Sequence, residues 1–551
     1  MHLLLSLLAT LVLTTNGAVS SPITHNTSQS SNGTTINLGY ATYEGSTNGL
    51  GINEFLGMRY AAPPLVNLRF RAPRDPLNET SIVKADAHGS ICMSVIQTFV
   101  PSNPSSEDCL FIDVYTPSTV SPESKLPVVL WIQGGAYTSK LPFLPNSQSQ
   151  SVNDNNNNMI VVTFNFRVGP YGFLASEAIR HDGDLNVGLL DQQKAMQWVQ
   201  KHISSFGGNP AHVVLMGTSS GGGDVLHHLA AYAGNPPHPF VGAIASSSYN
   251  THILPVQDLE FQYQDLLHAT NCTDLSCLRA LPTSAFQAAN TARPYPSPNS
   301  NPNSSPEIPI FTYAPCIDGT FFPQHPISLF QNGAFAHVPL LLGNTANEGT
   351  IFGLEANSSA QVRSLLRTNY PELTNGSLSR IEQLYPYDAA SQNVHHTPYF
   401  ASASAAYGEG FFTCPSLDIA RLVSGSASSA PVWDYRYNVR DPANVAAGLG
   451  VPHTWEIDAV WGPGFAVNAY GSNSYAGADA SIVPVVQGYW QSFVRGLNPN
   501  AWRAVGSPEW RRFGGDDWLV IQTNGTRMER RDESEMARCR FWDGITDGLN
   551  Q

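Results

Sequence analysis

The sequence predicts an α/β fold, in which a large and mostly parallel central sheet is flanked by helices within a single large domain. Apolar β-rich runs alternate with helix-like stretches, and this alternation implies crossover connections between parallel strands. The chain of 551 residues is long enough to bury a large core. No segment rich in proline, serine or asparagine is long enough to link independent domains, so we expect one domain with excursions.

Four short apolar runs are typical of buried parallel strands: residues 128–132, 159–164, 213–216 and 338–342, the last with a proline near its start. Residues 191–199 have the apolar spacing of a helix. A second helix is expected over residues 225–232, directly after a glycine-rich turn.

The charge balance excludes two classes of partner. The formal net charge is −14, which argues against binding to nucleic acid or to an anionic membrane surface. After the N-terminus, no stretch approaches the roughly 18 apolar residues of a transmembrane helix, so no integral membrane anchor is expected.

The N-terminus is typical of a secretory signal peptide. Residues 3–13 are almost entirely apolar, and small residues follow up to Ser21. We expect a signal peptide over residues 1–20, with cleavage near 17–20, and one α/β domain over 21–551; a buried N-terminal strand is the alternative to the signal peptide. Export to the exterior agrees with candidate glycosylation sequons at Asn26, Asn32, Asn78, Asn271, Asn303, Asn357, Asn375 and Asn524.

The sequence Gly217-Thr218-Ser219-Ser220-Gly221 has the form Gly-x-Ser-x-Gly. It lies between a predicted strand and a predicted helix, which is typical of a nucleophile elbow that holds the serine Oγ at a sharp turn. The glycines are needed because neighbouring backbone leaves no room for Cβ atoms. Ser219 is therefore the candidate nucleophile.

A serine nucleophile needs a base within hydrogen-bond reach and a third group that orients the base. Among sixteen histidines, His453 is the candidate base because a loop with Gly and Pro delivers it just before an ordered segment. His227 and His228 are adjacent on the elbow helix, and we expect them to pack or face solvent. Glu348, in a Gly-flanked turn after a buried strand, is the candidate acid, with an ordinary exposed turn glutamate as the alternative.

The segment Gln133-Gly134-Gly135-Ala136-Tyr137 follows the predicted strand 128–132. Acyl transfer creates an oxyanion that needs backbone N–H donors, and glycines let the backbone approach it closely. This loop is the candidate oxyanion hole, with a plain strand-to-loop turn as the alternative.

The chain resembles the type-B carboxylesterase/lipase family, the α/β-hydrolases that include cholinesterases and large fungal lipases. The similarity runs in order from about Leu38 to Trp542. It is carried, besides the elbow, by FLGMRYAAPP at residues 55–64, LRF at 68–70, SEDCL at 106–110, NFRVG at 165–169, GFL at 172–174, NVGLLDQ at 186–192 and FGGNP at 206–210.

The resemblance implies roles for individual residues. Ser219, Glu348 and His453 would form the triad, in the α/β-hydrolase chain order of nucleophile, acid and base. The oxyanion donors would be the backbone N–H groups of Gly135, Ala136 and Ser220, which makes the side chains of the last two secondary. Glu456 would be a buried carboxylate near the base, and two pairs would be structural ion pairs: Arg69 with Glu107, and Arg167 with Asp191.

The seven cysteines fit the same family. The implied disulfides are Cys92–Cys109, Cys272–Cys277 and Cys414–Cys539, and Cys316 would be a buried free thiol. Catalysis by Cys316 is the rival interpretation, but no activating partner is apparent in the sequence.

The sequence departs from the family pattern at four positions near the site. Thr218 stands where the family usually has glutamate, and the missing carboxylate would otherwise favour protonated His453. Asp224 replaces a small residue, and its charge could partly replace that of the glutamate. Gln133 replaces the usual His or Tyr, and Ala136 replaces a third glycine, a change that some fungal lipases of the family share.

The Cys92–Cys109 loop is shorter than the lid of the family's fungal lipases. Its apolar side chains could line an acyl or alcohol pocket: Met93, Val95, Ile96, Phe99 and Val100. A short flap predicts little interfacial activation and a preference for soluble or moderately hydrophobic esters.

Together these features predict a secreted, extracellular serine ester hydrolase that cleaves a small-molecule or lipid-like ester through an acyl-enzyme. Short- to medium-chain or aromatic esters are the expected substrates, and neither a metal nor an organic cofactor is required. Lipase, sterol esterase and feruloyl-type esterase are alternatives within enzymes. The alternative from another class is a non-catalytic, cholinesterase-like adhesion or binding protein.

Overall fold

The computed structural model describes residues 34–95, 105–139, 159–235, 238–292, 312–352, 354–389, 393–426, 430–463 and 474–549. The predicted signal peptide, the sequons at Asn26, Asn32 and Asn303, and the loop residues Ile96, Phe99 and Val100 lie outside these ranges.

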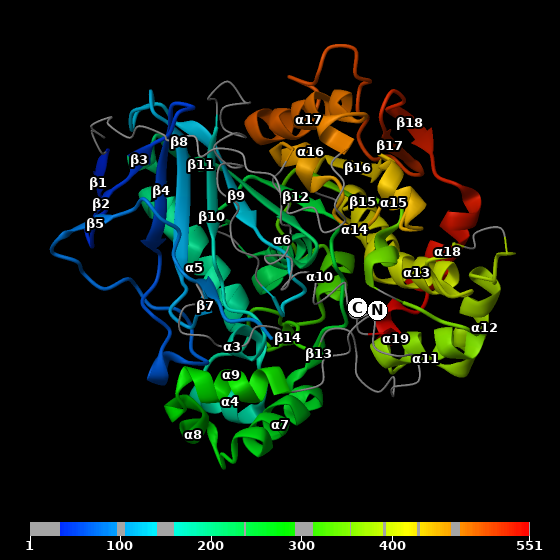
Figure 1. Ribbon diagram of the computed structural model, residues 1–551, viewed down its shortest axis with the longest axis horizontal. Helices are drawn as coiled ribbons and strands as arrows, with labels where there is room; N and C mark the ends of the chain where they lie inside the picture. The colour runs from blue at the N-terminus through cyan, green and yellow to red at the C-terminus, as the bar shows by residue number, and fades with distance from the viewer. Residues whose placement is uncertain are drawn as a thin grey trace, which may run out of the picture.

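Within the described residues, eleven strands form one large mixed sheet (Figure 1). The seven neighbours from β17 to β10 run parallel to one another, and the pairings towards both edges are antiparallel. The order across the sheet is β18 (Arg527–Arg530), β17 (Asp517–Ile521), β16 (Val432–Tyr437), β15 (Leu340–Thr345), β12 (Gly242–Ser246), β11 (Gly208–Thr218), β9 (Leu126–Ile132), β10 (Ile160–Phe164), β8 (Phe111–Pro117), β4 (Ile52–Arg59) and β3 (Ser46–Thr47).

Helices cover both faces of this sheet. Strand side chains alternate between the faces, so β9 sends Val128 and Leu130 into one hydrophobic core and Val129 and Trp131 into the other. The second core is packed by α16 (Ile457–Trp461) and α17 (Val483–Gly496), which lie together at one side in Figure 1. Layers of helix on both faces of a mostly parallel sheet are the predicted α/β architecture.

The remaining helices contribute to the first core or to the excursions. They are α3 (Pro170–Phe173), α4 (Glu177–Asp182), α5 (Val187–His202), α6 (Ser220–Ala230), α7 (Glu260–Thr270), α8 (Leu275–Ala280), α9 (Thr283–Ala292), α10 (Pro326–Gln331), α11 (Ser359–Asn369), α12 (Asn375–Leu384), α13 (Phe400–Gly408), α14 (Cys414–Gly425), α15 (Pro442–Ala446), α18 (Glu533–Asp543) and α19 (Thr546–Leu549).

Three small sheets complete the described part. β1 (Thr35–Asn37), β2 (Thr42–Glu44) and β5 (Ile82–Lys84) form one; β6 (Ile91–Cys92) pairs with β7 (Ser105–Ser106), and β13 (Leu254–Pro255) pairs with β14 (Cys316–Ile317).

Two predicted elements are displaced along the chain in the structure. The strand expected over 338–342 begins only at Leu340, after Pro339, which has no N–H for a ladder bond. The helix expected over 225–232 instead begins at Ser220 and ends at Ala230, because Tyr232 and Ala233 have φ of 54° and 56°. The other predicted strands and the helix over 191–199 are present, and three of these elements extend beyond the expected bounds.

Three disulfides are formed in the structure, between Cys92 and Cys109, Cys272 and Cys277, and Cys414 and Cys539. Cys316 is free and buried, and burial raises the pKa of its thiol. A thiol kept protonated by burial is a poor nucleophile, which agrees with a structural role for this cysteine.

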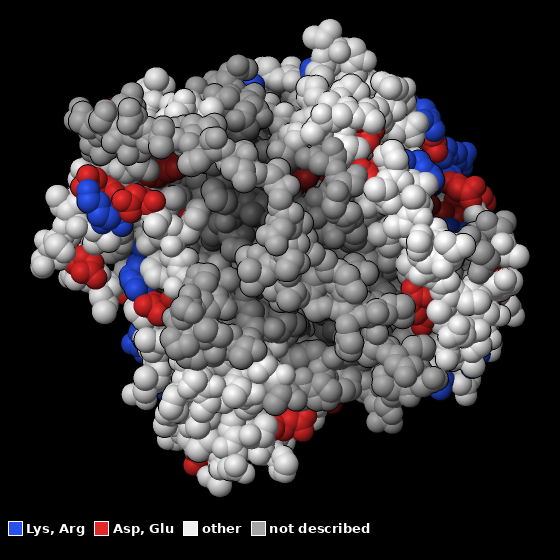
Figure 2. Space-filling model, viewed as in Figure 1, with Lys and Arg blue, Asp and Glu red and all other residues white. Residues whose placement is uncertain are grey.

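The surface agrees with an acidic protein of low charge density. On the face in Figure 2, the charged side chains that are drawn lie mostly towards the outer edge. The sequon residues within the described ranges are all exposed: Asn78, Asn271, Asn357, Asn375 and Asn524. Among the helices described, none combines the length and apolar character that crossing a bilayer requires.

Candidate active site

Ser219 occupies a sharp turn between β11 and α6. Its backbone has φ of 61° and ψ of −129°, in a region that a residue with a Cβ rarely adopts. The turn is tight: a Cβ on Gly217 would lie 2.1 Å from the carbonyl oxygen of Gly221, and one on Gly221 would lie 2.2 Å from that of Ile132. Both positions therefore require glycine, and the serine side chain is held at the apex.

His453 lies between Ser219 and Glu348, so the structure brings the three predicted residues together. The Nε2 of His453 is 2.8 Å from Oγ of Ser219. Its Nδ1 makes a short contact with Oε2 of Glu348. The other carboxylate oxygen of Glu348 accepts the N–H of Thr345 at 2.7 Å, and both His453 and Glu348 are buried. Glu348 opens a short 3₁₀ helix over Glu348–Phe352, rather than an exposed turn.

The loops that carry Glu348 and His453 are joined by Asn347. Its backbone N–H donates to the carbonyl of Val451 at 3.0 Å, and its side-chain Oδ1 accepts the N–H of Val451 at 2.9 Å. Gly450 has φ of 65°, and a Cβ there would lie 2.2 Å from that same Oδ1. Asn347 thus fixes the separation of Glu348 and His453, a role that its position beside Glu348 did not reveal.

Two aromatic rings pack against the His453 imidazole. The ring centroids of Phe412 and Phe352 lie 4.6 Å and 5.4 Å from that of His453. Phe352 follows Glu348 on the same 3₁₀ helix, whereas Phe412 lies on a π-helical turn, Glu409–Thr413, that precedes α14. Sequence reasoning missed both residues, because ring contacts between distant segments leave no local pattern.

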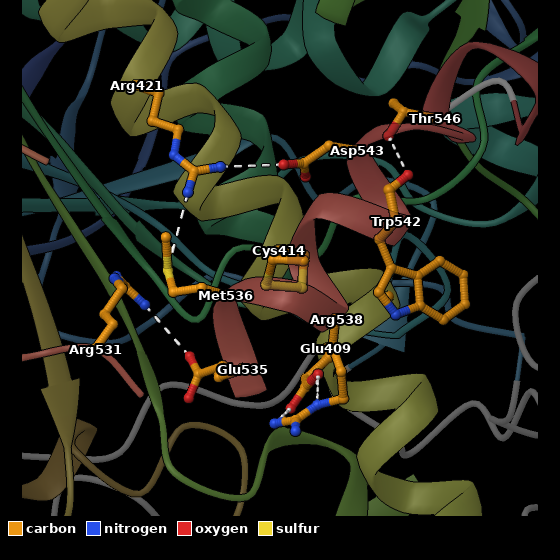
Figure 3. The surroundings of a disulfide bond; sticks show 12 residues. Glu409, Cys414, Arg421, Arg531, Glu535, Met536, Arg538, Trp542, Asp543 and Thr546 are labelled. Atoms are coloured by element: carbon orange, nitrogen blue, oxygen red, sulfur yellow. Dashed lines mark hydrogen bonds and ion pairs between the residues drawn. A yellow bond between two sulfur atoms is a disulfide. The ribbon is translucent and has the colours of Figure 1, made fainter. Parts of the chain in front are cut away.

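Helix α18 is joined by a disulfide and an ion pair to the turn Glu409–Thr413, which carries Phe412; Figure 3 draws both links. The Cys414–Cys539 disulfide joins the residue directly after this turn to α18. The guanidinium of Arg538 donates to both carboxylate oxygens of Glu409 at 2.7 Å, as the dashed lines in Figure 3 mark. Bidentate pairs of this kind fix orientation as well as distance.

The predicted oxyanion loop has a strained backbone. Gly135, Ala136 and Tyr137 all have positive φ, of 129°, 55° and 61°. A Cβ on Gly135 would lie 2.1 Å from the carbonyl oxygen of Ser139, and one on Gly134 would lie 2.9 Å from Cβ of Ser219. These glycines let the loop pass directly beside Ser219.

The N–H of Ala136 donates to Oγ of Ser220 at 2.8 Å. A predicted oxyanion donor is therefore bonded to the side chain of the residue after Ser219. The prediction treated that side chain as secondary, and the structure places it in direct contact with the loop.

Glu456 is buried near Glu348. Its Oε1 accepts the hydroxyl protons of Ser247 at 3.1 Å and Tyr435 at 3.3 Å. Burial, reinforced by the neighbouring charge of Glu348, raises the pKa of Glu456 to about 8. The carboxyl is therefore neutral at neutral pH.

Asp224 is fully buried in α6 and contacts α5. Its Oδ2 accepts the side-chain N–H of Gln192 at 2.6 Å, and its Oδ1 lies 3.5 Å from Nδ1 of His227. Gln192 in turn bonds Nε2 of His228 at 2.7 Å, and burial lowers the pKa of His228 to about 3. Both adjacent histidines are thus packed in a buried polar cluster.

The remaining predicted residues are Thr218 and the members of two structural ion pairs. Thr218 is buried at the end of β11. The buried pairs Arg69–Glu107 and Arg167–Asp191 are ion-paired at 2.6 Å and 2.7 Å. In the part of the chain that the structure describes, no group of three or more His, Cys, Asp or Glu is arranged to hold a metal ion.

Known proteins resemble the chain over nearly its whole length. A family model described as the carboxylesterase family matches residues 34–542. The crystal structure of EstA from Aspergillus niger is 41% identical, with a TM-score of 0.88 over 94% of this chain and 99% of that chain. A secreted lipase 4 from Gibberella zeae is 28% identical over 89% of this chain and 88% of its own length. A para-nitrobenzyl esterase from Bacillus subtilis is 29% identical over 91% and 97%.

Proposed function

The chain belongs to the carboxylesterase family and is a carboxylic ester hydrolase, and from that premise we propose that it acts through an acyl-enzyme on Ser219. His453 is the base and Glu348 the acid of the triad. The observation that carries the proposal is the continuous contact from Ser219 Oγ through the His453 imidazole to the Glu348 carboxylate.

In the acylation half, Nε2 of His453 takes the proton of Ser219 as Oγ attacks the ester carbonyl carbon. The carbonyl oxygen becomes an oxyanion, which the N–H groups of Gly135, Ala136 and Ser220 stabilise. Collapse of this intermediate breaks the ester C–O bond, and His453 protonates the leaving alcohol. Water, deprotonated by His453, then attacks the acyl carbon. The bond to Ser219 Oγ breaks, the carboxylic acid product is released, and His453 returns the proton to Ser219.

Glu348 and Asn347 orient the His453 imidazole for these proton transfers. The carboxylate of Glu348 keeps the proton of the imidazole on Nδ1, which leaves the Nε2 lone pair directed at Ser219. Because the loops of acid and base are bonded to each other, this geometry exists before substrate binds. Pre-organisation of this kind lowers the barrier without raising affinity for the ground state.

Labelling with a fluorophosphonate tests the proposed nucleophile. We expect one adduct on wild-type protein, located at Ser219 by mass spectrometry, and none on Ser219→Ala. Folded wild-type protein that neither reacts nor hydrolyses esters would favour the non-catalytic binding alternative. An adduct on another serine would overturn the assignment of the triad.

Secretion and glycosylation are part of the same proposal. Support comes from the apolar N-terminal segment, the formed disulfides, which persist in an oxidising exterior, and the exposed sequons. The name of the Gibberella zeae relative also contains the word secreted. Protein collected from a culture medium should begin between residues 17 and 21 and lose mass on treatment with an endoglycosidase.

The substrates proposed are short- to medium-chain or aromatic esters. The name of the Bacillus subtilis relative refers to para-nitrobenzyl esters, which are aromatic. The second candidate is a lipase, which the names of relatives from Gibberella zeae and Geotrichum candidum favour. A kcat/KM series over p-nitrophenyl esters of rising chain length, with methyl ferulate and a sterol ester, separates these. A steep rise in activity once a triglyceride exceeds its solubility would favour the lipase.

A further inference from the structure

The side chain of Ser220 lies at the oxyanion hole. Ser220 is the first residue of α6 and is 1% exposed. Its Oγ accepts the N–H of Ala136 at 2.8 Å, across the turn from the nucleophile. The hydroxyl therefore stands beside the N–H groups to which the proposed function assigns the oxyanion.

This hydrogen bond determines what the hydroxyl can do next. A serine hydroxyl has one proton and two lone pairs, and the Ala136 N–H occupies a lone pair. The O–H proton remains to be donated. A buried hydroxyl that donates gains far more from an ionised acceptor than from a neutral one, and accepting the Ala136 N–H polarises the O–H further.

The oxyanion of the proposed mechanism would form beside this hydroxyl, since Ser220 directly follows Ser219 in the chain. We infer that the Ser220 hydroxyl is a side-chain donor of the oxyanion hole: it donates its own proton to the tetrahedral intermediate, while the Ala136 N–H is shared between Ser220 Oγ and the oxyanion. Ser220 then supplies two donors, its backbone N–H and its hydroxyl. This inference rests on the proposed acyl-enzyme mechanism and adds to it a catalytic residue that acts through its side chain.

The negative charge that develops on the carbonyl oxygen explains why such a donor stabilises the transition state. The neutral carbonyl of a bound ester attracts the hydroxyl weakly, whereas the oxyanion attracts it strongly. The contact between Ala136 and Ser220 already fixes Oγ, so little reorganisation is needed as charge develops. Removal of the hydroxyl should therefore reduce kcat more than it changes KM.

The test compares Ser220→Ala, which removes the hydroxyl, with Ser220→Thr, which keeps it. We expect Ser220→Ala to lower kcat and kcat/KM together by about 10- to 100-fold, since removal of a single oxyanion donor has effects of that size or larger. Ser220→Thr should retain much more activity. Ser248→Ala is the matched control, because it also removes a buried hydroxyl, one that bonds Ser416.

A transition-state analogue separates this role from a structural one. A trifluoromethyl ketone that adds to Ser219 forms a charged oxyanion, so its affinity should fall in Ser220→Ala by the same factor as kcat/KM. An unreactive amide analogue of the substrate should bind with unchanged affinity. If Ser220→Ala does not fold, Ser220→Cys replaces it, and its weak S–H donor should give a similar loss.

Two results would overturn the inference. One is a Ser220→Ala enzyme whose kcat equals or exceeds that of the wild type, which would mean that the hydroxyl only occupies the Ala136 N–H in the resting state. The other is a loss of kcat without a matching loss of analogue affinity. Failure of the proposed function is distinguishable, because it would appear in the wild type as an absence of ester hydrolysis and of labelling at Ser219.

Discussion

The two sides of the proposed active site are held in place by different means. On the nucleophile side, Ser219, Gly135 and Ala136 all have positive φ, and backbone atoms pass within contact distance of one another. On the base side, the His453 ring is held by side chains, among them Glu348 and Phe412. The first side depends on steric exclusion between closely packed backbone segments, and the second on side-chain contacts between segments far apart in the chain.

This difference decides how each side should respond to mutation. A backbone turn that tolerates no Cβ fails abruptly, because no small adjustment removes an overlap with a carbonyl group. A ring held by several side chains should lose its position by degrees, as each contact is removed.

The largest effect is expected on the nucleophile side, for Gly221→Ala. The new Cβ would lie 2.2 Å from the carbonyl oxygen of Ile132, at the end of the strand that leads into the oxyanion loop. We expect kcat/KM to fall at least ~100-fold, since both the nucleophile and the oxyanion donors move. The measurement is steady-state kinetics on a p-nitrophenyl ester.

The control for this substitution is Gly425→Ala. Gly425 is the last residue of α14, and nothing lies within 4 Å of a Cβ placed there. Its activity should equal that of the wild type. A Gly221→Ala enzyme that is equally active would show that the elbow adjusts, and the contrast between the two sides would be lost.

On the base side, Arg538→Met should have an intermediate effect. It leaves the Glu409 carboxylate partly buried without its partner, at a cost of about 2–3 kcal/mol in the free energy of unfolding. Because Glu409 belongs to the turn that presents Phe412, kcat should also fall by roughly three- to tenfold as the His453 ring gains freedom. Denaturant unfolding and kcat measure the two effects.

The same helix provides a matched control, since Arg540 pairs with Glu533 on the exposed side of α18. Both side chains are more than half exposed, so Arg540→Met should change stability by less than about 1 kcal/mol and leave kcat unchanged. Equal effects of the two substitutions would mean that α18 does not hold the base side through Glu409.

The contrast also explains how much could be predicted from the sequence. The predictions of the α/β fold and of the family are confirmed. Both could be made from the sequence because strand-and-helix alternation and ordered motifs are local patterns. The elbow is visible in sequence for the same reason. Asn347, Phe412 and the Arg538–Glu409 pair are not, since each acts through a partner that is remote in the chain. The Ser220 side chain escaped notice because its partner is a backbone N–H.

For Glu456→Gln we expect a change in the pH dependence of stability, which tests the protonation of the carboxyl beside His453. Because the folded-state pKa of Glu456 is raised to about 8, the folded protein holds a proton that the unfolded chain releases near its usual pKa. This stabilisation is complete below the unfolded pKa and is lost as the pH rises to about 8. The wild type should therefore lose up to about 1.4 kcal/mol of unfolding free energy per pH unit within that window.

The amide introduced by Glu456→Gln cannot ionise, so the variant should lack this part of the pH dependence. Denaturant unfolding of both proteins at pH 5, 6.5 and 8 gives the comparison. Equal slopes for the two proteins would show that Glu456 is already ionised in the folded state at neutral pH.

The smallest effect is expected where the two sides meet, at Thr218, one residue before the nucleophile and buried at the end of β11. A carboxylate installed by Thr218→Glu would favour the protonated imidazole, so the acid limb of kcat/KM against pH should move upward by about one unit or less. Thr218→Gln, which has the same shape without the charge, should leave the limb in place. If Thr218→Glu does not move the limb while both variants stay active, then residue 218 does not act electrostatically on His453. The base would then be governed by its own side of the site, through Glu348 and its contacts alone.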